Sequence, residues 1–261
     1  MNRTVTTELL AEQRRRLILE RIRGRGAVKT SELSRLFTVS EITIRKDLQE
    51  LTERGEILRT HGGAVTRDSL AFEPSYQEKV VLHAEEKRRI GRAAAALIEE
   101  NMAVFIGNGS TTMEIVRHLD LVKPFKAFTN ALTHAIELAD LPALDLSVIG
   151  GYLRWKSYAM VGPLAKRALE GVYFDLVFLG VDGVSLEQGL TIPSLNEAET
   201  ARYIMMAGRK TVIVADHSKF GKVTHGKIVN IEEVDQIITD DGGDKEYMER
   251  LAELNVELII A

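Results

Sequence analysis

The clearest helical pattern near the start of the chain lies over residues 40–55. Apolar side chains recur there at i, i+4 and i+7, at Ile44, Leu48 and Leu51, so they form one stripe that faces a small core. Ser40 is a favoured N-cap residue, and glycine at position 55 is favoured just beyond a helix end. The pattern therefore predicts a helix that begins after Ser40 and ends at Gly55.

The opposite face of this predicted helix carries side chains suited to DNA. Thr and Gln hydrogen-bond to base edges, Ile contacts the methyl group of thymine, and Arg or Lys binds guanine edges or phosphates. The same spacing also fits an ordinary amphipathic surface helix, because periodicity does not distinguish the two. The candidate DNA-contacting residues of this helix are Ser40, Ile42, Thr43, Arg45, Lys46 and Gln49.

A hairpin is predicted directly after this helix. Residues 57–58 indicate a short strand, Gly62-Gly63 a tight turn, and residues 64–65 a returning strand. Arg59 and His61 lie on this hairpin and are further candidates for DNA contact. An ordinary surface hairpin remains the alternative.

Two further helical patterns precede these elements. Residues 13–23 carry apolar side chains on one side, at Leu17, Ile18 and Ile22, and end at a glycine stop. A second pattern begins at Thr30, a plausible N-cap, and a turn at residues 38–39 leads into the predicted DNA-contacting helix. Helix, short turn, helix and hairpin are the order of a winged helix-turn-helix. We therefore expect a DNA-binding domain over residues 1–66.

The rest of the chain predicts a linker and a larger domain. Residues 67–83 are polar and poorly periodic, which is typical of a linker, whereas residues 84–261 alternate apolar strand runs with helical segments. Strands buried on both faces of a sheet read as unbroken aliphatic runs, so a mostly parallel α/β sheet follows. The predicted helices are 84–100, 112–119, 131–139, 163–169, 197–207 and 245–254, and the predicted strands are 102–106, 126–129, 144–149, 175–179, 211–215, 236–239 and 256–260.

Charge divides the chain in the same place. Residues 1–67 hold 14 Lys and Arg against 9 Asp and Glu, a net of +5, whereas the whole chain holds 34 against 38, which leaves −9 for the remainder. A basic N-terminal part followed by an acidic remainder indicates that only the N-terminal part binds a polyanion. Cysteine is absent, which excludes disulfides and thiolate chemistry. No apolar run is long enough to span a bilayer, so we expect a cytoplasmic protein that does not enter membranes.

Ligands of parallel α/β sheets gather beyond the carboxyl ends of the strands, and several predicted loops lie there. The loop 107–112 joins a strand to a helix, and its glycines, hydroxyls and helix start favour an anion. It lacks the lysine ending of a nucleotide P-loop, so a small phosphate ester is favoured over ATP or NAD, and no cofactor is expected. A tight turn without a ligand is the alternative. The candidate effector-binding residues are Asn108, Gly109, Ser110, Thr111, Thr112, Asn130, Asp182, Glu197 and Lys219.

Two other kinds of site are not predicted. Residues 216–218 read Asp-His-Ser, but neighbours in sequence rarely converge into a hydrolase triad and no Gly-x-Ser-x-Gly elbow is present. The six histidines do not show the spacing of metal ligands such as His-Glu-x-x-His. We therefore predict neither catalytic residues nor a metal site.

Taken together, these motifs resemble one family across nearly the whole chain. Residues 14–65 resemble the DNA-binding domain of the DeoR/GlpR family of bacterial transcription regulators, above all at residues 39–48 and 59–64. The segments that resemble the sensor domain of that family are, in order, 109–112, 129–130, 150–151, 161–163, 179–183, 189–191 and 215–221.

The resemblance implies two binding partners, a small metabolite and DNA. It implies a sensor domain similar in fold to ribose-5-phosphate isomerase, which binds a phosphorylated sugar or a related metabolite and alters the affinity for double-stranded operator DNA. It also implies a repressor of carbohydrate-metabolism genes. Winged helix-turn-helix domains act in pairs on two-fold related half-sites, so we expect a homodimer or homotetramer.

The chain departs from the family pattern at two positions. Many members carry Asp where this chain has Gly107, and Lys where it has Ala201. Loss of a carboxylate and an ammonium changes which effector fits. Arg202 is an alternative source of positive charge, but it points about 100° further round the helix.

Three classes of function compete at this point: a transcription regulator, a sugar-phosphate isomerase or hydrolase with a DNA-binding head, and an architectural DNA-binding protein without a ligand. Isomerisation needs a placed base and acid, for which Asp182, Glu197 and Asp216 are candidate bases, but Gly107 and Ala201 argue against intact isomerase chemistry. The loop 107–112 argues against a body without a ligand. We therefore expect a regulator, with its effector, operator and regulated genes undetermined by the sequence.

Overall fold

The structure is a computed structural model that describes residues 11–261, apart from residues 26, 61, 67–72, 121–122 and 142–143. The chain divides into two compact units, Met1–Phe72 and Glu73–Ala261. Each unit has its own buried core. We describe them separately.

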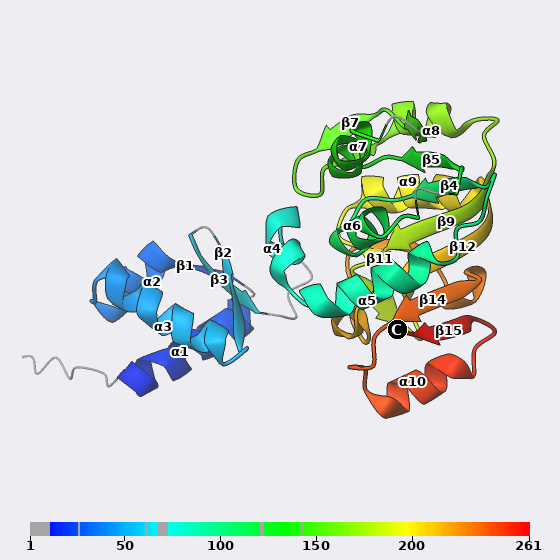
Figure 1. Ribbon diagram of the computed structural model, residues 1–261. Helices are drawn as coiled ribbons and strands as arrows, with labels where there is room; N and C mark the ends of the chain where they lie inside the picture. Colours follow the sequence, from blue (N-terminus) through cyan, green and yellow to red (C-terminus); the bar gives the residue numbers. More distant parts are fainter. Residues whose placement is uncertain (1–10, 26, 61, 67–72, 121–122, 142–143) are drawn as a thin grey trace, which may run out of the picture. The chain divides into compact units, whose positions relative to one another are not determined.

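The first unit contains the three predicted helices, α1 (Ala11–Arg25), α2 (Thr30–Phe37) and α3 (Glu41–Glu53) (Figure 1). Ser40 caps α3 as predicted, because its side chain accepts a hydrogen bond from the backbone N–H of Thr43. Gly55 follows the helix in the left-handed region at φ 72°, a conformation that glycine adopts without strain.

Two details of the first unit differ from the sequence prediction. Thr30 is not the N-cap of α2 but its first residue, because a short strand runs directly into the helix and places Lys29 at the cap without a side-chain hydrogen bond. Ile18 and Ile22 of α1 are buried as predicted, but Leu17 is 40% exposed and Leu19 enters the core in its place.

The predicted hairpin is confirmed and gains a third strand. Strand β2 (Ile57–Thr60) pairs antiparallel with β3 (Gly63–Thr66), which also pairs antiparallel with β1 (Ala27–Lys29). A Cβ at Gly63 would lie 1.8 Å from the carbonyl oxygen of Val28, so only glycine permits this approach of β3 to β1. The three helices and this small sheet make a winged helix-turn-helix.

A buried ion pair joins the first helix to the third. Arg14 donates two hydrogen bonds to Asp47, from Nε to Oδ2 at 2.6 Å and from Nη2 to Oδ1 at 3.1 Å. The two side chains are 10% and 3% exposed, and Arg15 approaches the same carboxylate at 3.5 Å. Burial of this charge depends on its partner, which makes the pair a stability determinant of the unit.

The second unit is built on a parallel sheet, as the unbroken aliphatic runs predicted. Its strand order is β15-β14-β12-β9-β4-β5-β6, and all of its neighbouring pairs are parallel. The strands are β4 (Ala103–Ile106), β5 (Lys126–Thr129), β6 (Asp145–Val148), β9 (Phe174–Gly180), β12 (Gly208–Val214), β14 (Gln236–Thr239) and β15 (Glu257–Ile260).

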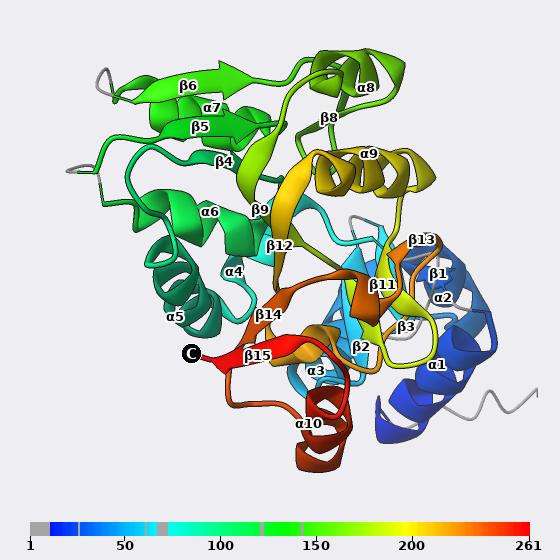
Figure 2. The same cartoon turned by 90° about the vertical axis from the view of Figure 1, so that its right-hand side faces the viewer.

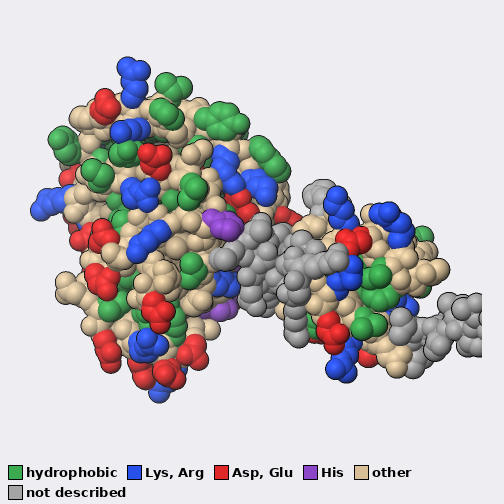
Figure 3. Space-filling model, turned by 180° about the vertical axis from the view of Figure 1, so that it is seen from behind, with side chains coloured by type: hydrophobic (Ala, Val, Ile, Leu, Met, Phe, Trp, Pro, Cys, Tyr) green, Lys and Arg blue, Asp and Glu red, His purple; other side chains and the backbone are tan. Residues whose placement is uncertain are grey.

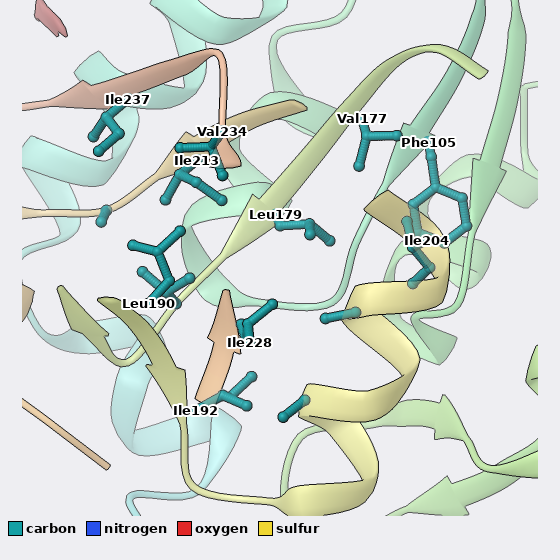
Figure 4. Close-up of a cluster of buried hydrophobic side chains, with 14 of the residues drawn as sticks. Phe105, Val177, Leu179, Leu190, Ile192, Ile204, Ile213, Ile228, Val234 and Ile237 are labelled. Atoms are coloured by element: carbon teal, nitrogen blue, oxygen red, sulfur yellow. The ribbon is translucent and has the colours of Figure 1, made fainter. Parts of the chain in front are cut away.

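Helices cover both faces of this sheet (Figure 2). Successive residues of one strand enter opposite cores, so Ile213 packs in one hydrophobic cluster, shown in Figure 4, while Val212 and Val214 pack in the other. One face carries α5 (Ala84–Ala95), α6 (Ser110–Arg117) and α7 (Leu132–Ala139), and the other carries α8 (Pro163–Leu169), α9 (Leu195–Met206) and α10 (Lys245–Ala252).

Short strands and turns that the sequence pattern did not predict complete the unit. They are too brief to show a period of two, and they pair with one another rather than with the main sheet. They form a two-stranded sheet of β7 (Tyr152–Arg154) and β8 (Ala159–Val161), a three-stranded sheet of β10 (Gly183–Ser185), β11 (Gly189–Ile192) and β13 (Gly226–Val229), and the 3-10 turns η1 (His217–Lys219) and η2 (Ile231–Glu233).

The predicted linker of residues 67–83 extends too far. Residues 73–83 belong to the second unit and include helix α4 (Tyr76–Val81). Ser75 and Glu78 form a capping box at its start, in which each side chain hydrogen-bonds to the backbone of the other residue. Among the described residues no helix is long and apolar enough to cross a membrane.

Candidate functional site

Helix α3 presents the predicted polar face to solvent. Ile42 is 70% exposed although it is apolar, and Lys46 and Gln49 are exposed beside it, while Ile44 and Leu48 are fully buried. Such a surface matches the mixture of apolar and hydrogen-bonding groups in the DNA major groove. The predicted recognition face is therefore accessible.

Some of the candidate side chains on α3 already have partners. The Ser40 hydroxyl lies 2.9 Å from the Thr43 hydroxyl as part of the cap. Arg45 donates to Glu41 at 3.2 Å, and Gln49 donates to Glu53 at 3.0 Å. Exposed pairs of this kind contribute little in water, so Arg45 and Gln49 exchange these partners for others at small cost.

Arg59 lies on strand β2 of the hairpin, as predicted, and its side chain binds α3. Its Nη1 donates to the main-chain carbonyl of Arg45 at 3.0 Å, which fastens β2 to α3, and its Nε is buried without a hydrogen-bond partner among the described residues. Arg59 thus positions the hairpin relative to α3. The other candidate of the hairpin, His61, lies outside the described residues.

The second unit contains a pocket at the carboxyl ends of strands β4 and β9, where ligands of parallel sheets bind. Seven of the nine predicted effector-binding residues line it: Asn108, Gly109, Ser110, Thr111, Asp182, Glu197 and Lys219. The other lining residues are Tyr76, Lys79, Lys156, Ser157, Gly180, Val181 and Ile192.

The remaining two candidates, Thr112 and Asn130, lie behind the pocket wall and hold it in shape. Asn130 accepts a hydrogen bond from the backbone N–H of Asn108 at 3.2 Å and donates to the carbonyl of Met160 at 3.2 Å. Thr112 donates to the carbonyl of Gly109 at 3.0 Å, and its hydroxyl lies 3.0 Å from Nε2 of His134. Both residues are buried and position the loop rather than face the cavity.

His134 supports this loop as a neutral imidazole. It is fully buried, and burial lowers its pKa from 6.5 to about 3 because the charged form loses its hydration. Hydroxyl groups contact both ring nitrogens, Thr112 at Nε2 and Thr133 at Nδ1, at 3.0 and 3.1 Å. The start of α6 is therefore held by hydrogen bonds between uncharged groups.

Two lysines converge on one carboxylate in the pocket. Lys79 of α4 lies 2.7 Å from Asp182, and Lys219 of η1 lies 3.4 Å from it. Burial raises the pKa of Asp182, but the two ammonium groups outweigh that effect and hold the pKa below its usual value. The pair of lysines also gives this wall a positive charge beside the first turn of α6.

Sequence reasoning missed Lys79, although a signal was present. Ser75 and Glu78 have the spacing of a capping box, which predicts a helix from residue 76 and excludes a linker there. Lys87 of α5 reinforces the arrangement by donating to the carbonyls of Lys79 and Leu82, and burial lowers its pKa to about 8.

Acidic groups on the opposite wall are held by an arginine. Arg154 pairs with Glu73 and lies 3.0 Å from Glu197, whose other oxygen accepts a hydrogen bond from the Asn108 amide at 3.2 Å. The Glu197 side chain is 3% exposed, and burial raises its pKa. Carboxylates fixed in this way accept hydrogen bonds from hydroxyl groups.

The two departures from the family pattern have structural consequences. A Cβ at Gly107 would lie 2.8 Å from Cδ2 of Leu179, so a carboxylate at this position requires Leu179 to move. Ala201 is buried in the hydrophobic cluster beneath the pocket. Arg202 does not line the pocket, because its guanidinium donates to the carbonyl of Lys227 at 2.6 Å.

The sequence Asp216-His217-Ser218 forms no catalytic triad, as expected. Asp216 accepts a hydrogen bond from the backbone N–H of Ser218, and its other oxygen is buried without a partner among the described residues. His217 pairs with Asp240 instead, at 2.7 Å. The order of an acid, a base and a hydroxyl along the chain therefore does not bring the three groups together.

Comparison with known proteins identifies both units. The family model for the DeoR-like helix-turn-helix domain matches residues 14–69, and that for the DeoR C terminal sensor domain matches residues 82–241. The putative aga operon transcriptional repressor of Escherichia coli O157:H7 is 35% identical over 95% of this chain and 93% of that protein. The HTH-type transcriptional regulator GlpR of Haloferax volcanii is 36% identical over 96% of this chain and 98% of that protein.

Solved structures resemble the second unit less closely. Ribose 5-phosphate isomerase A from Methanocaldococcus jannaschii matches with a TM-score of 0.40 and 15% identity over 53% of this chain and 55% of that one. At this level the likeness carries no argument about activity.

The family matches decide between the functional classes that the sequence left open. They cover both units, and the relatives are transcription regulators rather than enzymes. The chain belongs to the DeoR family of transcriptional regulators, with an N-terminal DNA-binding helix-turn-helix domain and a C-terminal sensor domain.

Proposed function

We propose that this regulator represses genes of carbohydrate metabolism and that a phosphorylated sugar or a related metabolite, bound in the pocket of the second unit, changes its affinity for operator DNA. The observation that carries the proposal is the pocket, where the first turn of α6 and the lysines at positions 79 and 219 meet. Repression is supported by the relative named as a repressor of the aga operon.

The start of α6 suits a phosphate group. Gly109, Ser110 and Thr111 line the pocket, and the first N–H groups of a helix have no partner within that helix. The helix dipole favours negative charge at the same end. Lys79 and Lys219 add two ammonium groups, so this end of the site receives the anionic group of the ligand.

The other wall suits the hydroxyl groups of a sugar. Glu197 and the Asn108 amide are held by Arg154 and by each other, so their orientation is fixed before a ligand binds. Carboxylate oxygens accept and amide groups both accept and donate, which matches the mixed character of a polyol. Anion and polyol contacts lie in one pocket, as a sugar phosphate requires.

A thermal-shift screen tests this effector class. Purified protein is heated with sugar phosphates, sugar acids and their unphosphorylated parents, because a ligand of the native state raises the melting temperature by mass action. We expect stabilisation by phosphorylated compounds only, lost in Lys79→Ala and retained in Lys245→Ala, whose side chain is 90% exposed on α10. A response confined to unphosphorylated compounds would remove phosphate from the proposal.

The DNA-binding surface is proposed to be the exposed face of α3. Ile42, Thr43, Lys46 and Gln49 read the major groove, Arg45 contacts the backbone, and Ser40 sets the helix start. Arg59 acts by fastening the hairpin to α3. Effector binding shifts DNA affinity only by as much as the effector prefers one of the two states of the protein.

Lys46→Ala tests this surface on the promoter beside the protein's own gene. Loss of one good base or phosphate contact costs about 1–3 kcal/mol, so we expect roughly 5- to 150-fold weaker binding. Arg16→Ala removes the same charge from α1, where the side chain is 82% exposed, and is the matched control. Equal affinity of Lys46→Ala and the native protein would reject the assignment.

Self-association is proposed to involve the β6 edge of the sheet. β6 is a terminal strand of the sheet, and Figure 3 shows apolar side chains among charged ones on the upper part of the second unit. The exposed apolar residues of this region are Ile136, Val148, Tyr152, Leu153, Trp155 and Leu164. Sedimentation velocity of Tyr152→Glu, with Tyr173→Glu as the control, tests whether the oligomer dissociates.

A further inference from the structure

We propose that the second unit contains a binding site for a divalent transition-metal ion of the zinc type, formed by His83, Glu86 and His217. One ligand atom of each residue lies within 4.8 Å of the others. Two imidazoles and one carboxylate are a donor set that Zn²⁺ takes readily, whereas Mg²⁺ and Ca²⁺ prefer oxygen ligands alone. The three residues are half-buried, so solvent reaches the site and supplies a further ligand.

His217 is prepared as a metal ligand by its hydrogen bond to Asp240. Nδ1 of His217 lies 2.7 Å from Oδ2 of Asp240, and a carboxylate only accepts hydrogen bonds, so Nδ1 carries the proton. The lone pair of Nε2 then remains for a metal ion. Such a carboxylate-histidine pair is the usual support of a metal-bound imidazole, because it fixes the ring and raises its basicity.

The support for His217 is itself fixed in place. Asp240 is buried and accepts hydrogen bonds from the backbone N–H groups of His217 at 2.7 Å and Gly242 at 3.0 Å. A Cβ at Gly242 would lie 2.6 Å from Nδ1 of His217 and 2.9 Å from Oδ2 of Asp240, so only glycine leaves room for this pair. The surroundings thus define the position of the imidazole closely.

His83 occupies a position that helix formation does not explain. It is the N-cap of α5, where Ser, Thr, Asp and Asn are favoured, but its side chain makes no capping hydrogen bond. Its backbone lies in the left-handed region at φ 51°, which is costly for a residue other than glycine. This conformation places its ring edge-on to that of His217, with the ring centroids 4.8 Å apart.

Glu86 completes the set from the first turn of α5. Its Oε1 lies 3.9 Å from Nδ1 of His83. In a tetrahedral zinc site with bonds of about 2 Å, ligand atoms are about 3.3 Å apart, so binding requires the three side chains to approach by up to about 1.5 Å. Rotation of half-buried side chains provides a movement of that size.

The proposed site is separate from the effector pocket but is connected to it. None of its three ligands lines the pocket. His217 and Lys219 nevertheless share the turn η1, and His83 joins α5 to α4, which carries Lys79. An ion at the site therefore ties together the two segments that supply the lysines around Asp182. The proposal does not depend on the identity of the effector.

No metal site is predicted from the sequence, because the histidines lack the spacing of a metal motif. The ligands of this site come instead from distant segments of the chain. His83 and Glu86 lie before the sheet begins, and His217 follows β12. The competing explanation is an aromatic pair of two neutral imidazoles with no ion. That explanation predicts no response to zinc.

Calorimetric titration of the full chain, free of tag and treated with chelator, distinguishes the two explanations. We expect one Zn²⁺ to bind per chain and Mg²⁺ not to bind, with tetrahedral absorption bands when Co²⁺ is the probe. His83→Asn and His217→Asn are each expected to weaken Zn²⁺ binding at least about tenfold, and Asp240→Asn by about 10- to 100-fold. Trp155 fluorescence and circular dichroism verify that each variant is folded.

His225→Asn is the matched control, because His225 is exposed and lies outside the cluster. Its Zn²⁺ affinity is expected to equal that of the native chain. Absence of Zn²⁺ binding to the native chain, unchanged affinity of His83→Asn, or loss of binding in His225→Asn would each overturn the proposal. Should His217→Asn or Asp240→Asn fail to fold, His83→Asn decides, because its side chain makes no capping hydrogen bond to α5.

Discussion

Replacement of Asp47 by alanine tests how the winged helix-turn-helix unit is held together. The variant removes two hydrogen bonds from Arg14, at 2.6 and 3.1 Å, and leaves the Arg14 side chain, which is 10% exposed, without its carboxylate. Breaking a buried ion pair by removal of one partner costs about 3–5 kcal/mol, because the remaining charge stays out of water. A unit of this size has a free energy of unfolding of about 4–11 kcal/mol, so the variant is expected to lose a large fraction of it.

Hydrogen exchange of the full chain measures this loss within the first unit. Amides of α1 and α3 are expected to exchange at least about 100-fold faster in Asp47→Ala, since each 1.4 kcal/mol is a factor of ten. Amides of the second unit are expected to exchange at unchanged rates, because that unit has its own core. The apparent DNA affinity is expected to fall in proportion to the fraction of molecules whose first unit is folded.

Two controls make the reasoning refutable. Glu20→Ala breaks the exposed pair of Arg16 and Glu20, whose side chains are 82% and 56% exposed, and is expected to change stability by less than about 1 kcal/mol. Arg14→Met combined with Asp47→Leu removes both charges and is expected to recover most of the stability. If Asp47→Ala matched Glu20→Ala, Arg14 would have to reach water once unpaired, and the assumption that its charge stays buried would be wrong.

Two further predictions concern the hairpin and pH. Gly63→Ala places a Cβ 1.8 Å from the Val28 carbonyl oxygen and is expected to abolish the pairing of β1 with β3 and to weaken DNA binding in a gel-shift assay. A Cβ at Gly62 meets nothing within 4 Å, so Gly62→Ala is expected to bind DNA like the native protein. Because burial lowers the pKa of His134 from 6.5 to about 3, the native state resists protonation, and stability present above pH 6.5 is lost as the pH falls towards 3. Between pH 6.5 and 4.5 this loss is about 2–3 kcal/mol, measured by urea unfolding followed by circular dichroism, and it should be absent in His134→Gln. An identical pH dependence in both proteins would show that other groups cause the loss.

The sequence by itself determined the elements whose signal is local. Ile44, Leu48 and Leu51 define one face of a helix through their spacing alone, and Ser40 caps it whatever the rest of the chain does. The seven predicted strand runs of the second unit became the seven strands of a parallel sheet. The central runs are apolar over residues 176–179 and 212–214 because helices cover both of their faces. The loops after those strands consequently met at one edge, which is why most candidate pocket residues were found.

Tertiary structure decided what depends on contacts between distant segments. Lys79 reaches Asp182 only because α4 packs within the second unit. From the sequence alone, the residues of this helix were assigned to a linker. Arg59 appeared free in the sequence but is bound to the carbonyl of Arg45. His83 and His217 meet across the junction of α5 with η1, at a separation that no spacing rule covers. Local patterns fix periodicity and caps, whereas the partners of a charged side chain are set by packing.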